Sequence, residues 1–204
     1  MERYEIHPIN PNNRFILKAV ESLNKGDLIS YPTGVNYGIG CALSSTQGVK
    51  TLNALTERLG RNRLHTIICK DISDVSKYAF VDNKVFKVMK RTFPGPYTFI
   101  LEATPLVPKI CQTRRKTIGI RIVDYPVVLA ILNKMESPLL NFSALHLNEE
   151  ELIESPALIE DIYSNYISVL LDIGPVPALH TTVVDFSSGE TVIIRQGAGD
   201  VSNL

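Results

Sequence analysis

Short apolar runs alternate with amphipathic segments along almost the whole chain, and this alternation is what most restricts its fold. The runs are rich in Val, Ile and Leu, as buried strands are. The segments between them repeat apolar residues every three or four positions, as helices do. Strands separated by helices predict an α/β architecture. The last two runs flank Ser188-Gly189, a hairpin turn, so the sheet is expected to mix parallel and antiparallel strands.

The boundaries of the expected elements come from apolar periodicity, capping residues and proline stops. The chain has no internal repeat, low-complexity segment or linker, so we expect a single domain over residues 1–204, with a twisted mixed sheet flanked by helices. The expected strands cover 27–31, 65–69, 97–102, 117–123, 138–142, 167–173, 181–186 and 191–195, and the expected helices cover 11–24, 44–57, 82–91, 126–133 and an acidic stretch before 167.

Composition restricts the class of protein. The 204 residues suffice for a sizeable core, and no apolar run approaches the roughly 18–20 residues of a membrane-spanning helix. The N-terminus lacks the apolar region of a secretory signal. Cys41, Cys69 and Cys111 form no C-x-x-C pair, which suits free, buried thiols in a reducing compartment. These features predict a cytoplasmic protein without a membrane partner.

The formal net charge is zero, but the charges are unevenly spread. Bases far outnumber acids from Arg58 to Arg121, whereas acids dominate after Arg121. This asymmetry predicts a concave cationic cleft that attracts nucleotide or RNA phosphate, unless folding mixes the two regions. The bases most suited to an RNA or phosphate patch are Lys87, Lys90, Arg91, Arg114, Arg115 and Lys116. For the last three, a solvated loop is the alternative.

A glycine-rich stretch follows the strand that ends at Pro32. We expect it to be a loop carrying Gly34, Gly38 and Gly40, in which the absence of side chains lets a ligand approach the backbone. The alternative is a tight connection that merely requires glycine. The spacing fits neither the dinucleotide fingerprint nor the P-loop.

Six motifs, in order, resemble those of the YrdC/YciO family. The similarity spans about residues 10 to 200 and implies the fold of that family. The motifs are Tyr31-Pro-Thr33 with Tyr37-Gly38 and Gly40-Cys41, Pro94-Gly-Pro-Tyr-Thr98, Thr117-Ile-Gly-Ile-Arg121, Asn141-Phe-Ser143, Thr181-Thr-Val-Val-Asp185 and Arg195-Gln-Gly-Ala-Gly199.

This resemblance implies an L-threonylcarbamoyladenylate synthase, which joins threonine, bicarbonate and ATP, releases pyrophosphate and supplies a partner complex that modifies tRNA. ATP would be a substrate, accompanied by Mg²⁺, with no metal held by the protein itself. Thr33 and Arg121 would hold the amino-acid end of the ligand. The implied nucleotide contacts are Thr98, Ser143 and Arg195, and the remaining site residues are Tyr37, Arg58 and Thr181, the last in place of serine.

The chain departs from the family pattern at three points, as the YciO branch does. The family has a Lys-x-Arg pair in this region. When the motif is placed without gaps, Thr56 stands at the lysine position, and when it is shifted by one residue, Glu57 stands there, so the lysine is missing in both cases. The asparagine of a Ser-x-Asn pair is replaced by Leu145, and an acidic residue by Gly34. Two hypotheses therefore stand: a synthase, or a non-catalytic module that binds nucleotide, tRNA or double-stranded RNA in the same basic cleft. The four histidines lack metal-ligand spacing.

Overall fold

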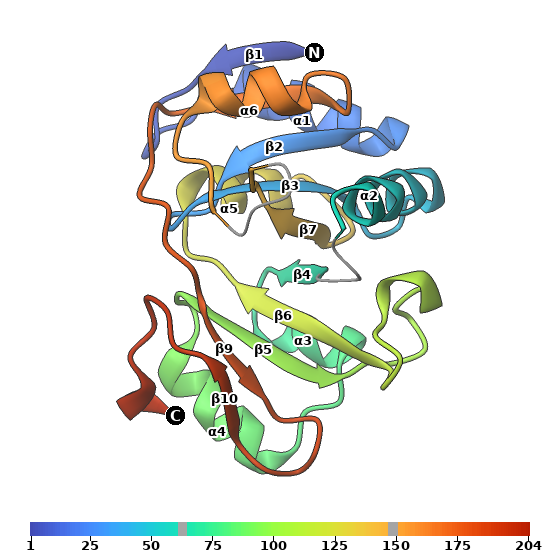
Figure 1. Cartoon of the computed structure of the whole chain (residues 1–204), viewed down its shortest axis with the longest axis vertical. Coiled ribbons are helices and arrows are strands. Elements are labelled where there is room, and N and C mark those ends of the chain that lie inside the picture. The colour runs from blue at the N-terminus through green and yellow to red at the C-terminus, as the bar shows by residue number, and fades with distance from the viewer. Residues whose placement is uncertain (61–64, 147–150) are drawn as a thin grey trace.

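The computed structural model describes residues 1–60, 65–146 and 151–204 (Figure 1). Strands and helices alternate along it. The strands are β1 (Glu2–Glu5), β2 (Leu28–Pro32), β3 (Tyr37–Ala42), β4 (Thr66–Cys69), β5 (Tyr97–Glu102), β6 (Thr117–Ile122), β7 (Leu139–Ser143), β8 (Ile167–Asp172), β9 (Thr182–Asp185) and β10 (Val192–Arg195). The helices are α1 (Asn13–Lys25), α2 (Thr46–Arg58), α3 (Ile72–Tyr78), α4 (Asn83–Thr92), α5 (Pro126–Leu132) and α6 (Pro156–Tyr163), with 3-10 turns η1 (Lys109–Cys111) and η2 (Val201–Asn203). None of these helices has the length and apolarity needed to cross a membrane.

The strands form one open sheet in the order β1-β8-β2-β3-β7-β4-β6-β5-β9-β10. Four neighbouring pairs are parallel: β1–β8, β2–β8, β4–β6 and β5–β9. The other pairs are antiparallel, including the predicted β9–β10 hairpin. The expectation of a mixed sheet flanked by helices is therefore confirmed.

Local sequence explains where the helices begin and end. The Asn12 side chain accepts a hydrogen bond from the Arg14 backbone at the start of α1, and Gly26 ends that helix with a φ of 88°, a conformation that glycine adopts without strain. The side chains of Ser45 and Asp82 cap α2 and α4 in the same way. These three helices, α1, α2 and α4, lie within about two residues of their predicted bounds.

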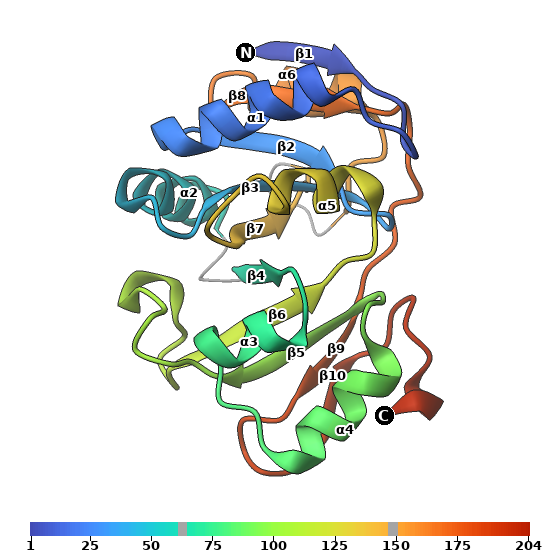
Figure 2. The same cartoon turned by 180° about the vertical axis from the view of Figure 1, so that it is seen from behind.

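Successive residues of a strand point to opposite faces, and the buried apolar residues accordingly form two cores. Leu170 packs into the larger core, which includes residues of α2, α3, α4 and α6, whereas Leu171 packs into the smaller one. The smaller core lies between the sheet and the helices α1 and α5, which are seen together in Figure 2. The three cysteines are free and buried, as expected.

The glycine-rich stretch after Pro32 is not a loop, and this corrects the sequence-based expectation. Only a tight turn at residues 33–36 separates β2 from β3, and Gly38 and Gly40 lie inside β3. A Cβ atom on Gly40 would lie 3.1 Å from the Tyr31 hydroxyl, and one on Gly38 would lie 2.7 Å from the Asn141 amide nitrogen. The two glycines therefore make room for neighbouring side chains on the sheet.

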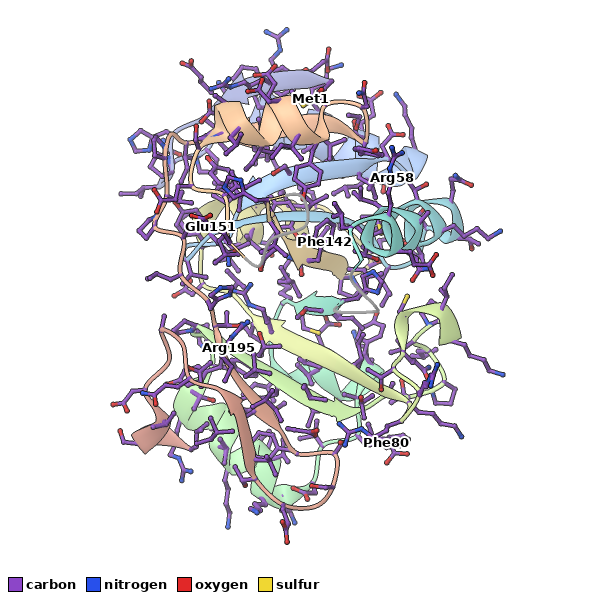
Figure 3. All side chains as sticks on the ribbon, in the orientation of Figure 1. Met1, Arg58, Phe80, Phe142, Glu151 and Arg195 are labelled. Atoms are coloured by element: carbon purple, nitrogen blue, oxygen red, sulfur yellow. The ribbon has the colours of Figure 1, made fainter. Side chains whose placement is uncertain are left out.

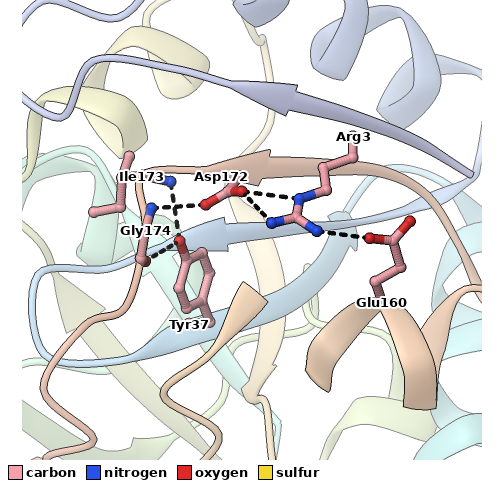
Figure 4. Close-up of polar contacts among 6 residues, drawn as sticks. All are labelled: Arg3, Tyr37, Glu160, Asp172, Ile173 and Gly174. Carbon is pink, nitrogen blue, oxygen red and sulfur yellow. Dashed lines mark hydrogen bonds and ion pairs between the residues drawn. The ribbon is translucent and has the colours of Figure 1, made fainter. Parts of the chain in front are cut away.

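An ion-pair network fastens the N-terminal strand to the rest of the sheet (Figure 4). Arg3 on β1 contacts Asp172 on β8 at 2.7 Å and Glu160 on α6 at 2.8 Å. The second carboxylate oxygen of Asp172 accepts a hydrogen bond from the Gly174 backbone, while the Tyr37 hydroxyl donates to the Gly174 carbonyl. The network thus joins β1, β8, α6 and the start of β3.

Candidate functional site

Small and polar side chains cross the middle of the sheet on one face. Strand register places Gly40, Asn141, Thr66, Gly119, Ile100 and Asp185 in one row. Residues in register share a face, and this face is the one that α1 and α5 cover further along. Since most of these side chains are too small or too polar to continue the smaller core, the face remains open here.

A cavity of about 270 Å³ occupies this open face. It brings together five of the predicted ligand-binding residues from five different parts of the chain. Figure 3 labels two of the lining residues, Phe142 and Arg195. The predicted residues that line the cavity are Thr98, Arg121, Ser143, Thr181 and Arg195, and they are joined by Thr66, His65, Asn141, His180 and Arg115 among others.

Arg121 is the most unusual residue of this cavity. Its side chain projects from β6 and is only 4% exposed. Burial lowers the pKa of its guanidinium from the ordinary 12.5 to about 10, the neighbouring Tyr31 acts in the opposite direction, and no described carboxylate acts on it. A buried cation without an acidic partner is costly, so an anion from solution is the natural partner.

The surroundings of Arg121 are polar and incompletely paired. Arg121 Nε and Asn141 Oδ1 are buried, and each lacks a hydrogen-bond partner among the described atoms, while the buried Tyr31 hydroxyl interacts with the Asn141 side chain. Burial raises the pKa of Tyr31, and the charge of Arg121 opposes that shift. Tyr31 therefore stays protonated at neutral pH. Unpaired buried polar atoms are rare in folded proteins, and they are most often found where a ligand or water binds.

Two motif segments fold onto each other at the side of the cavity. The hydroxyls of Thr98 and Thr181 are 2.7 Å apart. Arg195 donates from Nε and Nη2 to the Thr181 carbonyl, at 3.2 and 3.1 Å. The loop after β10 is held by the Thr182 hydroxyl, which donates to the Gly199 carbonyl at 2.7 Å. The segment at 195–199 thus positions Arg195 over the segment at 181–185.

The structure does not place three other predicted residues in the cavity. The Thr33 hydroxyl contacts Asn36 within the β2–β3 turn, although the Asn36 amide reaches Ser143 at 3.3 Å. Tyr37 is fully buried, and its hydroxyl is bonded to backbone groups at 173–174. Arg58 is exposed, and its guanidinium lies over a tyrosine ring at 5.7 Å.

The two basic clusters predicted to form an RNA or phosphate patch lie apart. Lys87, Lys90 and Arg91 are exposed on α4, at the lower left of Figure 1, whereas residues 114–116 precede β6, which begins at the right. Of these six bases only Arg115 lines the cavity. Arg61 and Arg63, also in the basic part of the sequence, lie outside the described residues.

Sequence reasoning did not assign several cavity residues. Asn141 begins a motif that we used only for Ser143, and Thr66 and His65 lie at a strand start without any motif. Thr56 lines the cavity and contacts His65 at 3.2 Å, whereas Glu57 is exposed. Within the described part of the chain, no group of three or more His, Cys, Asp or Glu side chains is arranged to hold a metal ion.

Comparisons with known proteins identify the family and agree with the fold. The family model Sua5_yciO_yrdC, described as telomere recombination, matches residues 21–197. The uncharacterized protein YciO of Escherichia coli K12 is 36% identical, and the match covers 97% of this chain and 96% of that protein. The crystal structure of E. coli YciO superposes with a TM-score of 0.91 at 35% identity, over 99% of this chain and 98% of that one.

More distant relatives carry names that describe an activity or a ligand. A threonylcarbamoyl-AMP synthase of Vibrio vulnificus is 24% identical over 88% of this chain and 97% of its own. The crystal structure of P. abyssi Sua5 complexed with L-threonine has a TM-score of 0.86 at 21% identity. The match covers 97% of this chain and 58% of that one, and shows a common fold.

Proposed function

This chain belongs to the Sua5/YciO/YrdC family, and we propose that its cavity binds ATP and L-threonine and makes threonylcarbamoyl-AMP from them and bicarbonate. The product would serve tRNA modification by partner proteins. Mg²⁺ would enter with the phosphates of ATP. The distant threonylcarbamoyl-AMP synthase and the fold shared with a threonine-bound Sua5 support this proposal.

One observation carries the proposal: the Arg121 guanidinium is buried in a cavity wall without a described acidic partner. All three substrates are anionic or carry a carboxylate. A guanidinium can accept a carboxylate or phosphate through two parallel hydrogen bonds. A ligand of this kind would neutralise Arg121 and complete its hydrogen bonds.

The chemistry requires charge stabilisation rather than a protein nucleophile. The threonine amine would attack the carbon of bicarbonate and, with loss of water, give a carbamate. A carbamate oxygen would then attack the α-phosphorus of ATP, and pyrophosphate would leave. Arg121 and Arg195 would stabilise the negative charge on carboxylate and phosphate oxygens, and the hydroxyls of Thr98, Ser143 and Thr181 would orient the ligands. Thr33 would act through the Asn36 contact to Ser143.

The test is the release of pyrophosphate from ATP by the purified protein with L-threonine and bicarbonate. Each substrate is omitted in turn, and an active threonylcarbamoyl-AMP synthase is assayed alongside. We expect release that depends on all three substrates and falls by more than tenfold in Arg195→Ala. Absence of release beside an active control would refute the synthase.

A second function rests on the departures from the family pattern. Leu145 lines the cavity and replaces the amide of the family, and neither Thr56, which also lines the cavity, nor Glu57 supplies the lysine of the family. These changes would weaken a catalytic phosphate site. The alternative is therefore a module that binds tRNA, double-stranded RNA or nucleotide without turnover. Contacts to a nucleic-acid backbone would make affinity fall steeply as salt rises. A salt-independent affinity for a tRNA or a 20-bp RNA duplex would exclude binding of the RNA backbone by the basic cleft.

A further inference from the structure

Arg115 contacts the cavity wall through an ion pair with Asp185. Its Nη2 lies 2.9 Å from Asp185 Oδ2, while its side chain remains 67% exposed. Asp185 is buried, with 5% of its side chain exposed, so the pair is solvated on the arginine side alone. The other oxygen of Asp185 accepts from both the backbone nitrogen and the hydroxyl of Ser187, at 2.8 and 2.6 Å. Asp185 would therefore remain hydrogen-bonded if Arg115 moved away.

The turn that presents Arg115 has an unusual backbone. Lys116 is the only non-glycine residue with a positive φ among those described, at 58°. A lysine in this left-handed region is strained, and such strain is often kept at ligand sites. Hydrogen bonds between Thr113 and Thr117 close the turn from both sides. The turn thus holds Arg115 against the cavity at a cost in conformational energy.

Three arginines lie around β9 on the open face: Arg195 and Arg115 contact the β9 segment, and Arg121 projects from β6, two strands away. Arg195 lies at the Thr181 carbonyl and Arg115 at Asp185, four residues further along. At about 3.3 Å per residue, the two ends are ~13 Å apart. Phe99 on β5 pairs with Ile120 on β6, so the neighbouring residues Thr98 and Arg121 are level with each other. Thr98 in turn pairs with Val183 on β9, which is the midpoint between Thr181 and Asp185. The distance between Arg195 and Arg115 is longer than a single phosphate or carboxylate can span.

We propose that Arg115 is a further ligand-binding residue of the cavity, which exchanges Asp185 for the far end of a polyphosphate chain when the ligand enters. This inference rests on the proposed function, in which the ligand is a nucleoside triphosphate. Asp185 acts as a stand-in anion that keeps Arg115 in place while the cavity is empty. The assignment separates Arg115 from its neighbour Arg114, which is also exposed but does not line the cavity.

The experiment measures dissociation constants by calorimetry with inorganic tripolyphosphate, ATP and orthophosphate. In Arg115→Gln, we expect tripolyphosphate and ATP to bind at least tenfold more weakly, and orthophosphate to change by less than twofold. Arg114→Gln is the matched control, with changes below twofold for all three ligands. Equal losses in the two variants would show a diffuse basic surface, and unchanged tripolyphosphate binding in Arg115→Gln would also overturn the proposal.

Asp185 provides an independent test of the exchange. Asp185→Asn releases Arg115 and should tighten tripolyphosphate binding at least threefold, but not when Arg115→Gln is also present. If that variant is unstable, Ser187→Ala replaces it. Loss of the hydroxyl leaves Asp185 more dependent on Arg115, so binding should weaken. An unaltered affinity in the folded variants would refute the exchange.

The outcome for the proposed function is read separately, from threonine-dependent pyrophosphate release. If turnover is absent but tripolyphosphate binding still depends on Arg115, the inference stands and the synthase fails. If the wild-type protein binds no polyphosphate, both fail.

Discussion

Replacing Arg121 with methionine should make the protein more stable and deprive it of its anionic ligand. Methionine keeps much of the arginine chain volume but introduces no charge. The guanidinium is 4% exposed and has no described acidic partner, so the folded protein carries an uncompensated charge. The substitution removes that cost, and with it the group that we propose binds carboxylate or phosphate.

The pKa of Arg121 gives the size of the effect. Its fall from 12.5 to about 10 corresponds to about 3 kcal/mol by which folding disfavours the charged form. For a chain of this size, that is an increase of roughly 6–12 °C in Tm. Because the pKa of the base is lowered on folding, the cost is fully present at every pH below about 10. The gain in Tm should therefore be equal at pH 6 and pH 8.

Differential scanning calorimetry with and without tripolyphosphate tests both effects. We expect Arg121→Met to melt above the wild type without ligand. Tripolyphosphate should raise the Tm of the wild type, but not that of Arg121→Met. Arg114→Met is the control, because it removes an exposed arginine outside the cavity. A lower Tm for Arg121→Met, together with a preserved response to tripolyphosphate, would refute the reasoning.

Three further substitutions test the packing around the site. Gly40→Ala should destabilise the fold by ~1–3 kcal/mol in urea unfolding, because its methyl would lie 2.7 Å from a backbone carbonyl oxygen of β7. Thr182→Val removes two buried hydrogen bonds to the loop after β10 and should cost ~1–3 kcal/mol, and a loss below 0.5 kcal/mol would contradict this role. Burial alone would raise the pKa of Asp185, but hydrogen bonds from Ser187 and Arg115 lower it. Its stabilising effect is thus present above about pH 4 and lost below, so the Tm deficit of Asp185→Asn at pH 6 should shrink at pH 3.

The sequence was sufficient for elements whose signals are local. Helices α1, α2 and α4 were predicted, because each has an N-terminal capping residue, an apolar stripe and a recognisable C-terminal end. Strand β3 was not, because Gly38 and Gly40 look like loop residues until the Tyr31 side chain lies across them. The short elements β1 and α3 were not predicted either.

The same distinction explains the site. Thr98, Arg121 and Arg195 could be found because each belongs to a motif. Thr66 belongs to no motif and enters the cavity through its register with Asn141, which is not visible in the sequence. Asn141 does belong to a motif, but the resemblance implied a ligand contact for Ser143 alone in that motif. Tyr37 was expected to be a site residue, but its hydroxyl is bonded to backbone groups at 173–174. These groups lie far along the chain, so the contact could not be foreseen from the sequence.

The ion-pair network at Arg3 implies an order of events during synthesis. Its partner Asp172 follows 169 residues later, so β1 has no place in the sheet until nearly the whole chain has been translated. At about 5–20 residues per second, β1 waits roughly 10–30 s after its own synthesis until β8 has been made. An unpaired strand is open to wrong partners during that time. The charges of Glu2, Arg3 and Glu5 disfavour such pairing, and they allow a strand made long before β8 to join the sheet only when β8 is present.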